Sequence, residues 1–297
     1  MKKIKALLLV LLIPVFVISQ SVSPQVVSSA GDFFEGTNVS LSWTLGEIAT
    51  ETLSNGNVIL TQGFQQPFSV ILAGIDLDVL VYLEGPYSGT EMRTDLNTAG
   101  EIPLNQPYNT APWNYSGTES VLSIPNSDVV DWVMVELRDA ADAVSATSAT
   151  TIAQKAGFIL KDGSVVDING TSNMQFTNSV SDNLFVVVWH RNHLGVMSSG
   201  PLTGSAGVYT YNFSTDLSQA YGGGAGYKLV GASVYGMPGG DFDGDGDVDD
   251  FDKAAWASTA GTPGYQAPDF NMDNQVNNPD KDDIWVENTT LESQVPD

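Results

Sequence analysis

Acidic side chains recur at regular spacing near the C-terminal end of the chain. Counted from Asp241 to Asp252, oxygen-bearing side chains fall at positions 1, 3, 5, 9 and 12, glycine falls at position 6 and valine at position 8. Side chains at 1, 3 and 5, the carbonyl at 7, a ligand at 9 and a bidentate carboxylate at 12 wrap a calcium ion, and the glycine makes the sharp turn. This segment is therefore predicted to bind calcium.

The same pattern repeats 28 positions later, from Asp269 to Asp280. Asn274 stands at position 6, where asparagine is the next best residue for a left-handed backbone. Val248 and Val276 share position 8, and we expect them to pair across the two loops. Amides replace carboxylates at positions 3 and 9 of the second loop, so we expect it to bind calcium more weakly than the first.

The two loops define the candidate ligands of two Ca²⁺ sites. They are Asp241, Asp243, Asp245, Asp247, Asp249 and Asp252 in the first loop, and Asp269, Asn271, Asp273, Gln275, Asn277 and Asp280 in the second. Residues 241–297 carry 13 Asp and 2 Glu against 2 Lys, a cluster that repels itself unless cations neutralise it. We therefore expect this end to fold with calcium. A disordered acidic tail is the alternative, although such tails do not repeat a twelve-position pattern.

A short helix is predicted after each loop, at residues 253–257 and 281–285. Trp256 and Ile284 occupy equivalent places in these segments, and we expect them to form a small core. The loops match the EF-hand pattern, with Asp at position 12 where a helix-loop-helix EF-hand usually has Glu.

Duplicated loops that end in Asp, each followed by a helix, resemble the type I dockerin domain over roughly residues 240–290. The resemblance implies two calcium ions and a cohesin-type partner protein. In dockerins, loop positions 10 and 11 help to choose that partner. Here they are Asp250-Phe251 and Asn278-Pro279, which are neither the small hydroxyl pairs common in the family nor alike in the two halves. This departure bears on cohesin binding and leaves the calcium ligands intact.

The first residues and the overall charge indicate where the protein works. Three lysines within residues 1–5 precede an apolar run, Ala6–Ile18, which predicts a signal peptide over residues 1–20, with a membrane anchor as the alternative. With 11 Lys and Arg against 35 Asp and Glu, the net charge is −24, which disfavours nucleic acid and anionic membranes as partners. We expect a secreted, extracellular or cell-surface protein with no membrane span after signal removal. The sequence has no cysteine, so no disulfide supports the fold.

Short runs of alternating or continuous apolar residues predict a mainly β fold, a β-sandwich of jelly-roll or immunoglobulin-like type, with the small α-helical calcium module after it. We expect an N-terminal β segment at 21–70, the sandwich at 71–236 and the dockerin-like module at 237–297. The segments 131–139 and 185–198 look similar to a module of secreted bacterial surface proteins that carry dockerin-like repeats. Strands are predicted at 39–45, 58–60, 77–83, 121–124, 129–137, 157–160, 165–168, 184–189, 208–213 and 229–235.

Three local features refine this prediction. Asn55-Gly56 and Asp162-Gly163 predict hairpin turns, because these residues tolerate positive φ. Leu184–Trp189 is apolar without alternation, which is typical of a central strand covered on both faces. Gly236–Gly240 is predicted to be the linker to the calcium module.

His190 and His193 are the only histidines, spaced as a pair that could hold zinc or copper with a third ligand from elsewhere. Hydrogen bonding in a strand-end turn is the interpretation that we favour. An enzyme would most naturally be a glycoside hydrolase with two carboxylates, but no spacing selects a pair, and Glu136 is better explained beside Arg138 on a strand. No nucleophile elbow or phosphate loop occurs, so no catalytic or cofactor-binding residue is assigned.

Aromatic residues in loops raise a third possibility, that of sugar binding. Trp113, Tyr115, Tyr87 and Tyr108 lie in segments rich in Pro, Asn and Gly, where exposed rings stack on pyranose faces or plug the ends of a sandwich. The sequence thus predicts a secreted, calcium-binding, non-catalytic protein that acts in adhesion or in contact with carbohydrate or matrix. The alternative is a component of extracellular polysaccharide degradation, associated with glycoside hydrolases, that docks through a dockerin–cohesin interaction.

Overall fold

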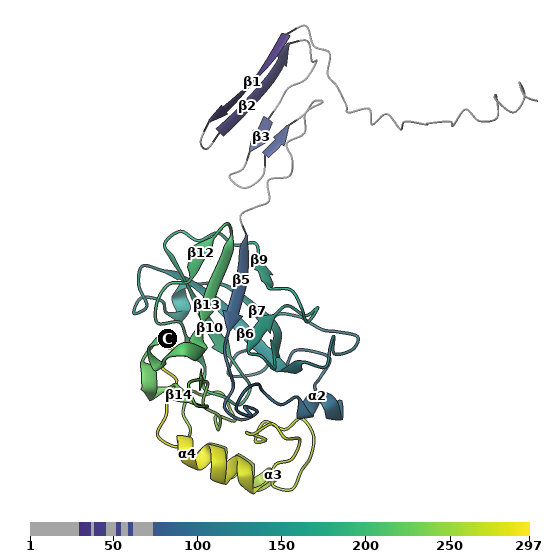
Figure 1. Ribbon diagram of the computed structural model, residues 1–297, viewed down its shortest axis with the longest axis vertical. Helices are drawn as coiled ribbons and strands as arrows, with labels where there is room; N and C mark the ends of the chain where they lie inside the picture. The colour runs from purple at the N-terminus through teal and green to yellow at the C-terminus, as the bar shows by residue number, and fades with distance from the viewer. Residues whose placement is uncertain (1–29, 37–38, 46–51, 55–58, 62–73) are drawn as a thin grey trace, which may run out of the picture. The chain divides into compact units, whose positions relative to one another are not determined.

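The structure, a computed structural model, describes residues 30–36, 39–45, 52–54, 59–61 and 74–297 (Figure 1). The chain divides into two compact units, residues 1–70 and 71–297, and each is treated by itself. The predicted signal peptide at 1–20 lies outside the described residues. Within the described part of the chain, no helix is long and apolar enough to cross a membrane.

The first unit contains two antiparallel pairs of strands. Strand β1 (Ala30–Gly36) pairs with β2 (Val39–Leu45), and β3 (Thr52–Ser54) pairs with β4 (Ile59–Thr61). The pairing of Ser54 with Ile59 confirms the predicted hairpin, whose turn residues lie outside the described ranges.

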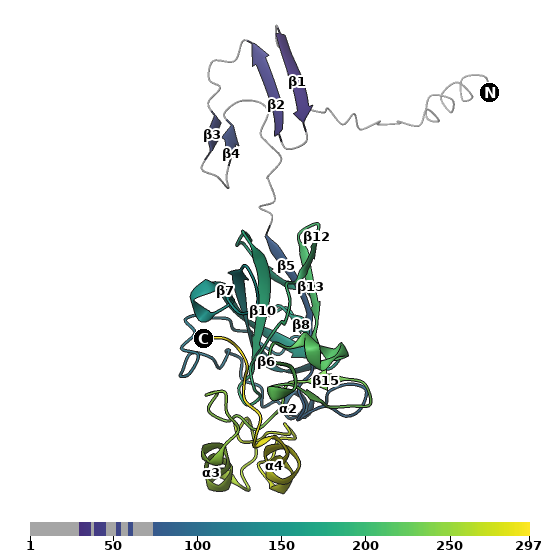
Figure 2. The same cartoon turned by 90° about the vertical axis from the view of Figure 1, so that its left-hand side faces the viewer.

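The second unit is built on one curled, mixed sheet of nine strands (Figures 1 and 2). Its order is β11-β10-β6-β7-β8-β5-β13-β12, with β9 also paired to β5, and only β13 and β5 run parallel. The strands are β5 Ile75–Leu80, β6 Val129–Ala140, β7 Thr151–Leu160, β8 Ser164–Val166, β9 Met174–Phe176, β10 Asn183–Trp189, β11 Val196–Met197, β12 Thr203–Ser205 and β13 Val208–Asn212.

The prediction of a mainly β chain is confirmed, with 31% strand and 17% helix. The sequence predicts a β-sandwich, in which the strands divide between two sheets. In the structure, strands β5 to β13 are hydrogen-bonded in one sheet. The reason is that β5 pairs with β8 and β9 on one side and with β13 on the other, which joins the two halves. The Asp162-Gly163 turn is confirmed between β7 and β8, with φ +87° at Gly163.

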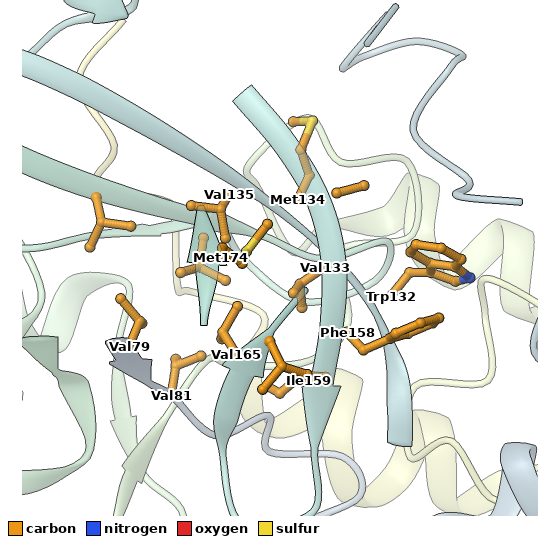
Figure 3. Close-up of a cluster of buried hydrophobic side chains, with 14 of the residues drawn as sticks. Val79, Val81, Trp132, Val133, Met134, Val135, Phe158, Ile159, Val165 and Met174 are labelled. Carbon is orange, nitrogen blue, oxygen red and sulfur yellow. The ribbon is translucent and has the colours of Figure 1, made fainter. Parts of the chain in front are cut away.

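The core lies on the long central strands β6, β7 and β10. The residues from Leu184 to Val188 are buried without alternation, as predicted for a strand covered on both faces. Trp132 packs against Phe158 with ring centroids 4.1 Å apart, and Val79 and Met174 belong to the same cluster (Figure 3). Burial of this apolar surface is the main stabilising term of the unit.

Two predicted strands were wrong. Residues 121–124 form no strand, and only the neighbouring Ser120 makes a bridge, to Asn105. The segment 229–235 is divided by a turn into two short strands, β14 (Lys228–Leu229) and β15 (Tyr235–Gly236), which pair with each other. The turn is closed by the amides of Val230 and Gly231, which donate to the carbonyl of Val234 at 2.8 and 3.1 Å.

The predicted linker Gly236–Gly240 is buried and hydrogen-bonded. The amide of Leu194 donates to the carbonyl of Pro238 at 2.9 Å, and the amide of Gly240 donates to the carbonyl of Asn192 at 3.0 Å. A side chain on Gly239 would lie 2.7 Å from Ile284, so this glycine serves close packing and not flexibility. The predicted boundary at 236/237 falls inside the second compact unit.

Short helices complete the second unit. They are α2 Asp95–Ala99, α3 Asp250–Thr259, the π-helical turn η5 Asp280–Trp285, α4 Val286–Asn288, and the 3₁₀ turns η1 Ser148–Thr150, η2 Phe213–Thr215, η3 Leu217–Gln219 and η4 Gly223–Ala225. Helices α3 and η5–α4 confirm the two predicted helical segments. Both views place α3 and α4 at the end of this unit opposite β12 (Figures 1 and 2).

Candidate metal-binding loops

The first loop, residues 241–252, gathers carboxylates around one point. One ligand oxygen each of Asp241, Asp243 and Asp252 lies within 4.8 Å of the others. Asp241 accepts the amide hydrogens of loop positions 4 and 6, at 2.7 and 3.3 Å. Asp252 accepts those of positions 2 and 9, both at 2.7 Å. The backbone of the loop therefore orients the carboxylates that its own curvature brings together.

The second loop, residues 269–280, repeats the hydrogen bonds from backbone amides to its first and last carboxylates, although in the described residues only the first loop brings three carboxylates within 4.8 Å of one another. Asp269 accepts the amide hydrogens of positions 5 and 6, at 3.1 and 3.0 Å, and Asp280 accepts those of positions 3 and 9, at 2.9 and 2.7 Å. The side-chain oxygen Oδ1 of Asn277, at position 9, is buried without a hydrogen-bond partner. An orphaned oxygen at a predicted ligand position fits a cation site.

Positive φ angles bend both loops at positions 4 and 6. They occur at Gly244 (+71°) and Gly246 (+93°) in the first loop, and at Met272 (+58°) and Asn274 (+73°) in the second. Glycine and asparagine adopt this region at low cost, whereas methionine is strained there. The predicted role of Asn274 as the substitute for glycine is confirmed.

Burial and mutual repulsion raise the pKa values of the end carboxyls. Burial raises the pKa of Asp241 well above its usual range, with Asp252 as the next cause, and raises the pKa of Asp252 to about 6. Burial, followed by the charge of Asp280, raises the pKa of Asp269 to about 7, and burial raises that of Asp280 to about 6. Carboxylates so arranged are stabilised by a cation among them.

Two tryptophans connect the repeats reciprocally. The indole N–H of Trp256, after the first loop, donates to the carbonyl of Asn277 at 2.7 Å. The indole N–H of Trp285, after the second loop, donates to the carbonyl of Asp249 at 2.8 Å. Both acceptors occupy position 9 of the opposite loop, so each helix holds the other repeat's loop. We call this pair of bonds the tryptophan cross-brace.

The lysine that follows each loop completes the same symmetry. Lys253 lies 5.0 Å from the ring centroid of Trp285, and Lys281 lies 4.8 Å from that of Trp256. In the second repeat, Trp285 and not the predicted Ile284 corresponds to Trp256, because the π-helical turn adds one residue to the second helix. Sequence reasoning missed the cross-brace, although the repeated Lys and Trp were its signal.

The predicted pairing of Val248 with Val276 is wrong. The amide and carbonyl of Val276 bond to Thr262 and Gly261, at 3.0 and 2.7 Å, so that the edge of the second loop is already occupied. The predicted small core is confirmed in that Ile284 is buried and Trp256 packs against its cluster. That cluster consists of Leu194, Val248, Phe270, Ile284 and Trp285, so it includes a residue from the segment after β10.

The end of β10 holds the entry to the second loop. Arg191 Nη1 donates to the carbonyl of Gln266 at 2.6 Å, and Asn192 Nδ2 donates to the carbonyls of Ala267 and Asp269 at 2.9 and 2.8 Å. Arg191 and Asn192 are both buried. A loop ligand is thus positioned by residues of the sheet.

Asp131 on β6 anchors this contact. Its Oδ2 accepts from Arg191 Nε at 2.8 Å, and its Oδ1 accepts from the hydroxyl of Tyr265 at 2.7 Å. Burial by itself raises the pKa of Asp131, but Arg191, His190 and Tyr265 together lower it to about 2. The guanidinium of Arg191 also lies 4.1 Å from the ring centroid of Tyr265. Asp131, His190–His193 and Tyr265 are called the strand-end cluster below.

The histidine pair belongs to the strand-end cluster. The Nδ1 atoms of His190 and His193 are 3.1 Å apart, His193 Nε2 accepts the amide hydrogen of Gly85 at 3.1 Å, and His190 Nε2 lies 3.3 Å from Asp131 Oδ2. Burial lowers the pKa of both rings, that of His193 well below its usual range. His190 Nε2 completes no hydrogen bond despite its closeness to Asp131, whereas the other three ring nitrogens have partners within the protein, which supports the hydrogen-bonding interpretation for those three.

The loop aromatics divide into two classes. Tyr108 is fully buried and donates to the carbonyl of Trp132 at 2.9 Å, and Tyr115 is 9% exposed and donates to Glu119 at 2.6 Å. Both side chains belong to the core, so neither ring is exposed for stacking on a sugar. Trp113 and Tyr87 are partly exposed.

Comparisons with known proteins add little to the geometry. No family model and no curated protein sequence matches the chain. A solved chain from an interface mutant of a type II cohesin–X–dockerin complex of Acetivibrio cellulolyticus is 13% identical, with a TM-score of 0.36, over 73% of this chain and 97% of that chain. A likeness of this size carries no argument about fold or function.

Proposed function

We propose that this chain is a secreted, non-catalytic, calcium-binding protein of the extracellular space or cell surface, in which two calcium ions set the conformation of the end that follows the sheet. The ligands would be the carboxylates and amides of the two loops, an oxygen-only donor set that suits Ca²⁺. The signal-peptide pattern in residues 1–20 supports secretion.

The burial of the first carboxylate of each loop is the main support for the proposal. Asp241 and Asp269, at position 1 of the two loops, are 2% and 0% exposed and are surrounded by further carboxylates. Within each loop, a buried carboxylate close to other carboxylates costs free energy unless a cation lies among them. The orphaned Oδ1 of Asn277 points to the same role in the second loop.

The contacts around the loops indicate what bound calcium would do. Asn192 bonds the carbonyl of Asp269, and Arg93 Nη2 donates to the carbonyl of Asn271 at 2.8 Å. Ordering of the second loop therefore orders the face that it presents to the sheet. Calcium would act as a structural ion that joins the C-terminal end to the β domain.

Calorimetric titration of the chain with Ca²⁺ tests the proposal. Two ions per chain are expected, and Asp252→Asn and Asp280→Asn should each remove one. Asp250→Asn is the matched control, because this side chain is at position 10 and is 94% exposed. Unchanged uptake in both ligand variants, or no uptake by the parent chain, would overturn the proposal.

Docking onto a cohesin-type protein, as in a polysaccharide-degrading assembly, is the second candidate function. The dockerin resemblance implies it, and the exposure of Phe251 at position 11 favours it, because 73% exposure is unusual for a large apolar side chain. Val286 on α4 is also exposed, at 46%. These residues would contribute apolar contact to a partner.

A pull-down with immobilised cohesin modules, with calcium or with chelator, tests this second candidate. Capture that requires calcium and is lost in Phe251→Ser would support docking. Leu122→Ser is a suitable control, because Leu122 is fully exposed outside both loops. Equal capture of the two variants would remove the Phe251 argument.

A further inference from the structure

A pocket of about 400 Å³ lies between the first loop and the sheet. Glu136 of β6, Gln154 of β7 and Trp189 of β10 line it on the sheet side, and Trp113 and residues 244–247 line its other sides. Its volume falls in the range of ligand pockets, on the order of 300–1,000 Å³. Two residues of the first loop, Asp245 and Asp247, belong to both the lining and the proposed calcium site, at positions 5 and 7.

Glu136 holds the sheet side of the pocket in one arrangement. Its Oε1 accepts from Arg138 Nε at 2.7 Å and from Thr151 Oγ1 at 2.6 Å, and its Oε2 accepts from Gln154 Nε2 at 3.0 Å and from Trp189 Nε1 at 3.2 Å. A carboxylate engaged on both oxygens is a poor general acid or base. Glu136 instead positions its neighbours, which makes the pocket a preformed binding surface.

The indole of Trp113 is the unexplained group in this pocket. Its Nε1 is buried without a hydrogen-bond partner. In residues 74–297 the other four tryptophans, Trp132, Trp189, Trp256 and Trp285, each donate this hydrogen to a protein oxygen. Buried donors are normally paired, so a ligand acceptor is the natural partner for Trp113.

The first loop forms one wall of the pocket. A side chain on Gly244 would come within 2.7 Å of the Trp113 ring, so loop and ring are in direct contact. Asp245 and Asp247 line the pocket, while the carbonyl of Gly246 accepts from the amide of Ser293 at 2.7 Å. The shape of the pocket therefore depends on the conformation of the first loop.

The charges of the lining select the ligand. Asp247, Glu292 and Asp297 are acidic, whereas the charge of Asp245 is engaged by the proposed calcium ion and that of Arg138 is balanced by Glu136. Acidic polysaccharides would be repelled by this lining. Neutral sugars offer hydroxyl hydrogens to carboxylates, hydroxyl oxygens to an indole N–H, and apolar ring faces to the indoles.

We propose that the Trp113 pocket binds a neutral saccharide of one or two rings and that calcium in the first loop forms its wall. Trp113 would donate to a hydroxyl oxygen, and the side chain of Asp247, whose loop position ligates calcium through its backbone carbonyl, would accept hydroxyl hydrogens. This inference rests on the proposed calcium function of the first loop. It adds the class of ligand and the residues that recognise it.

Calorimetry of the full chain with neutral disaccharides of glucose, mannose and xylose tests the inference, in calcium and in chelator. At least one should bind in calcium, with binding lost in chelator. Anionic uronate disaccharides and cationic disaccharides of glucosamine are the comparison probes. Preferred binding of a charged probe, or neutral-sugar binding that is unchanged in chelator, would overturn the inference.

Two variants locate the site. Trp113→Phe keeps an aromatic ring but removes the donor and part of the indole, so binding should weaken by at least about 2- to 12-fold, the equivalent of one neutral hydrogen bond. Gln154→Ala changes an exposed pocket residue and should also weaken binding. Tyr87→Phe is the matched control, because this loop aromatic lies outside the pocket lining and should leave affinity unchanged. Equal affinities in all four proteins would exclude this pocket.

The calcium titration separates failure of this inference from failure of the proposed function. Two bound ions without saccharide binding would overturn the pocket proposal and leave the calcium proposal standing. An absence of calcium uptake would overturn both. The same titration on Trp113→Phe verifies that its loops are folded, since uptake of two ions is expected there as well.

Discussion

The two loops share their internal geometry but differ in what surrounds them. The second loop is set into the β domain: Phe270 and Met272 are 0% and 2% exposed, and Met272 belongs to the main core cluster. The first loop borders the Trp113 pocket and the solvent, with Asp245 and Asp247 exposed. The repeat thus supplies the same type of loop twice, and the neighbouring elements give each loop a different role.

Position 4 shows how the copies have diverged. Met272 adopts a strained positive φ, and its burial in the core offsets that strain. Gly244 adopts the same region without strain and leaves room for the ring of Trp113. We infer that the second loop serves mainly to attach the C-terminal end, and that the first is available to shape a binding site.

Breaking the attachment of the second loop should have the largest effect. Arg191→Ala would leave Asp131 buried without its cation and free the carbonyl of Gln266. Loss of one partner of a buried ion pair costs about 3–5 kcal/mol, so chemical unfolding in saturating calcium should show a decrease of that size. Arg93→Ala, which removes a partly exposed contact to the same loop, should cost far less. Similar values for the two variants would contradict the special role of the strand-end cluster.

Removing one calcium site at a time should separate the tasks of the loops. At a hundredfold excess over the dissociation constant, an ion that binds only the globally folded state stabilises it by about 2.7 kcal/mol, and an ion whose loop opens without global unfolding contributes less. Asp269→Asn should lower the free energy of global unfolding by an amount of this order. Asp241→Asn should lose one ion and the saccharide, with less loss of global stability. The measurements are urea unfolding and calorimetry on both variants, and the reverse ranking would refute the assignment of tasks.

The two loops could be predicted from the sequence because they are local. The spacing of Asp241 to Asp252, its repetition and the turn residue Asn274 follow from how one short segment wraps an ion. The long buried strand β10 was equally predictable, since an uninterrupted apolar run has few other uses. In each case one segment contains the whole signal.

The remaining features depend on residues far apart in the chain. The strand-end cluster joins Asp131, His190–His193 and Tyr265, and no local pattern indicates such a meeting. Gly236–Gly240 has the composition of a linker, yet its glycines are required by close packing. The residue of the second repeat that corresponds to Trp256 is Trp285 instead of Ile284 because of the π-helical turn, which sequence spacing alone does not show.

The tryptophan cross-brace offers a way to couple the loops without changing either ligand set. Trp256→Phe removes the bond to the carbonyl of Asn277, so it should weaken calcium binding in the second loop. Trp285→Phe should weaken binding in the first loop through Asp249. One neutral hydrogen bond contributes about 0.5–1.5 kcal/mol, which corresponds to about 2- to 12-fold in affinity. Calcium titrations combined with Asp252→Asn or Asp280→Asn assign each loss to a loop, and weakening of the loop on the variant's own side would contradict the cross-brace.

The histidine pair should give the smallest effect, as a dependence of stability on pH. Burial, together with the charge of Arg191, lowers the pKa of His190 and His193, against a rise at His190 from Asp131. Groups with a lowered folded pKa contribute stability that is present above their unfolded pKa, about 6.5, and is lost as pH falls through the folded value.

Urea unfolding in saturating calcium between pH 8 and 5 should therefore show a steeper fall for the parent chain than for His193→Gln, whose amide does not titrate. At pH 8 the free energies of unfolding of the two proteins should differ only by the cost of the substitution itself, because both side chains are neutral there. Parallel curves over the whole range would mean that His193 takes up its proton without disturbing the attachment of the second loop. The strand-end cluster would then hold that loop through Arg191 and Asn192 alone.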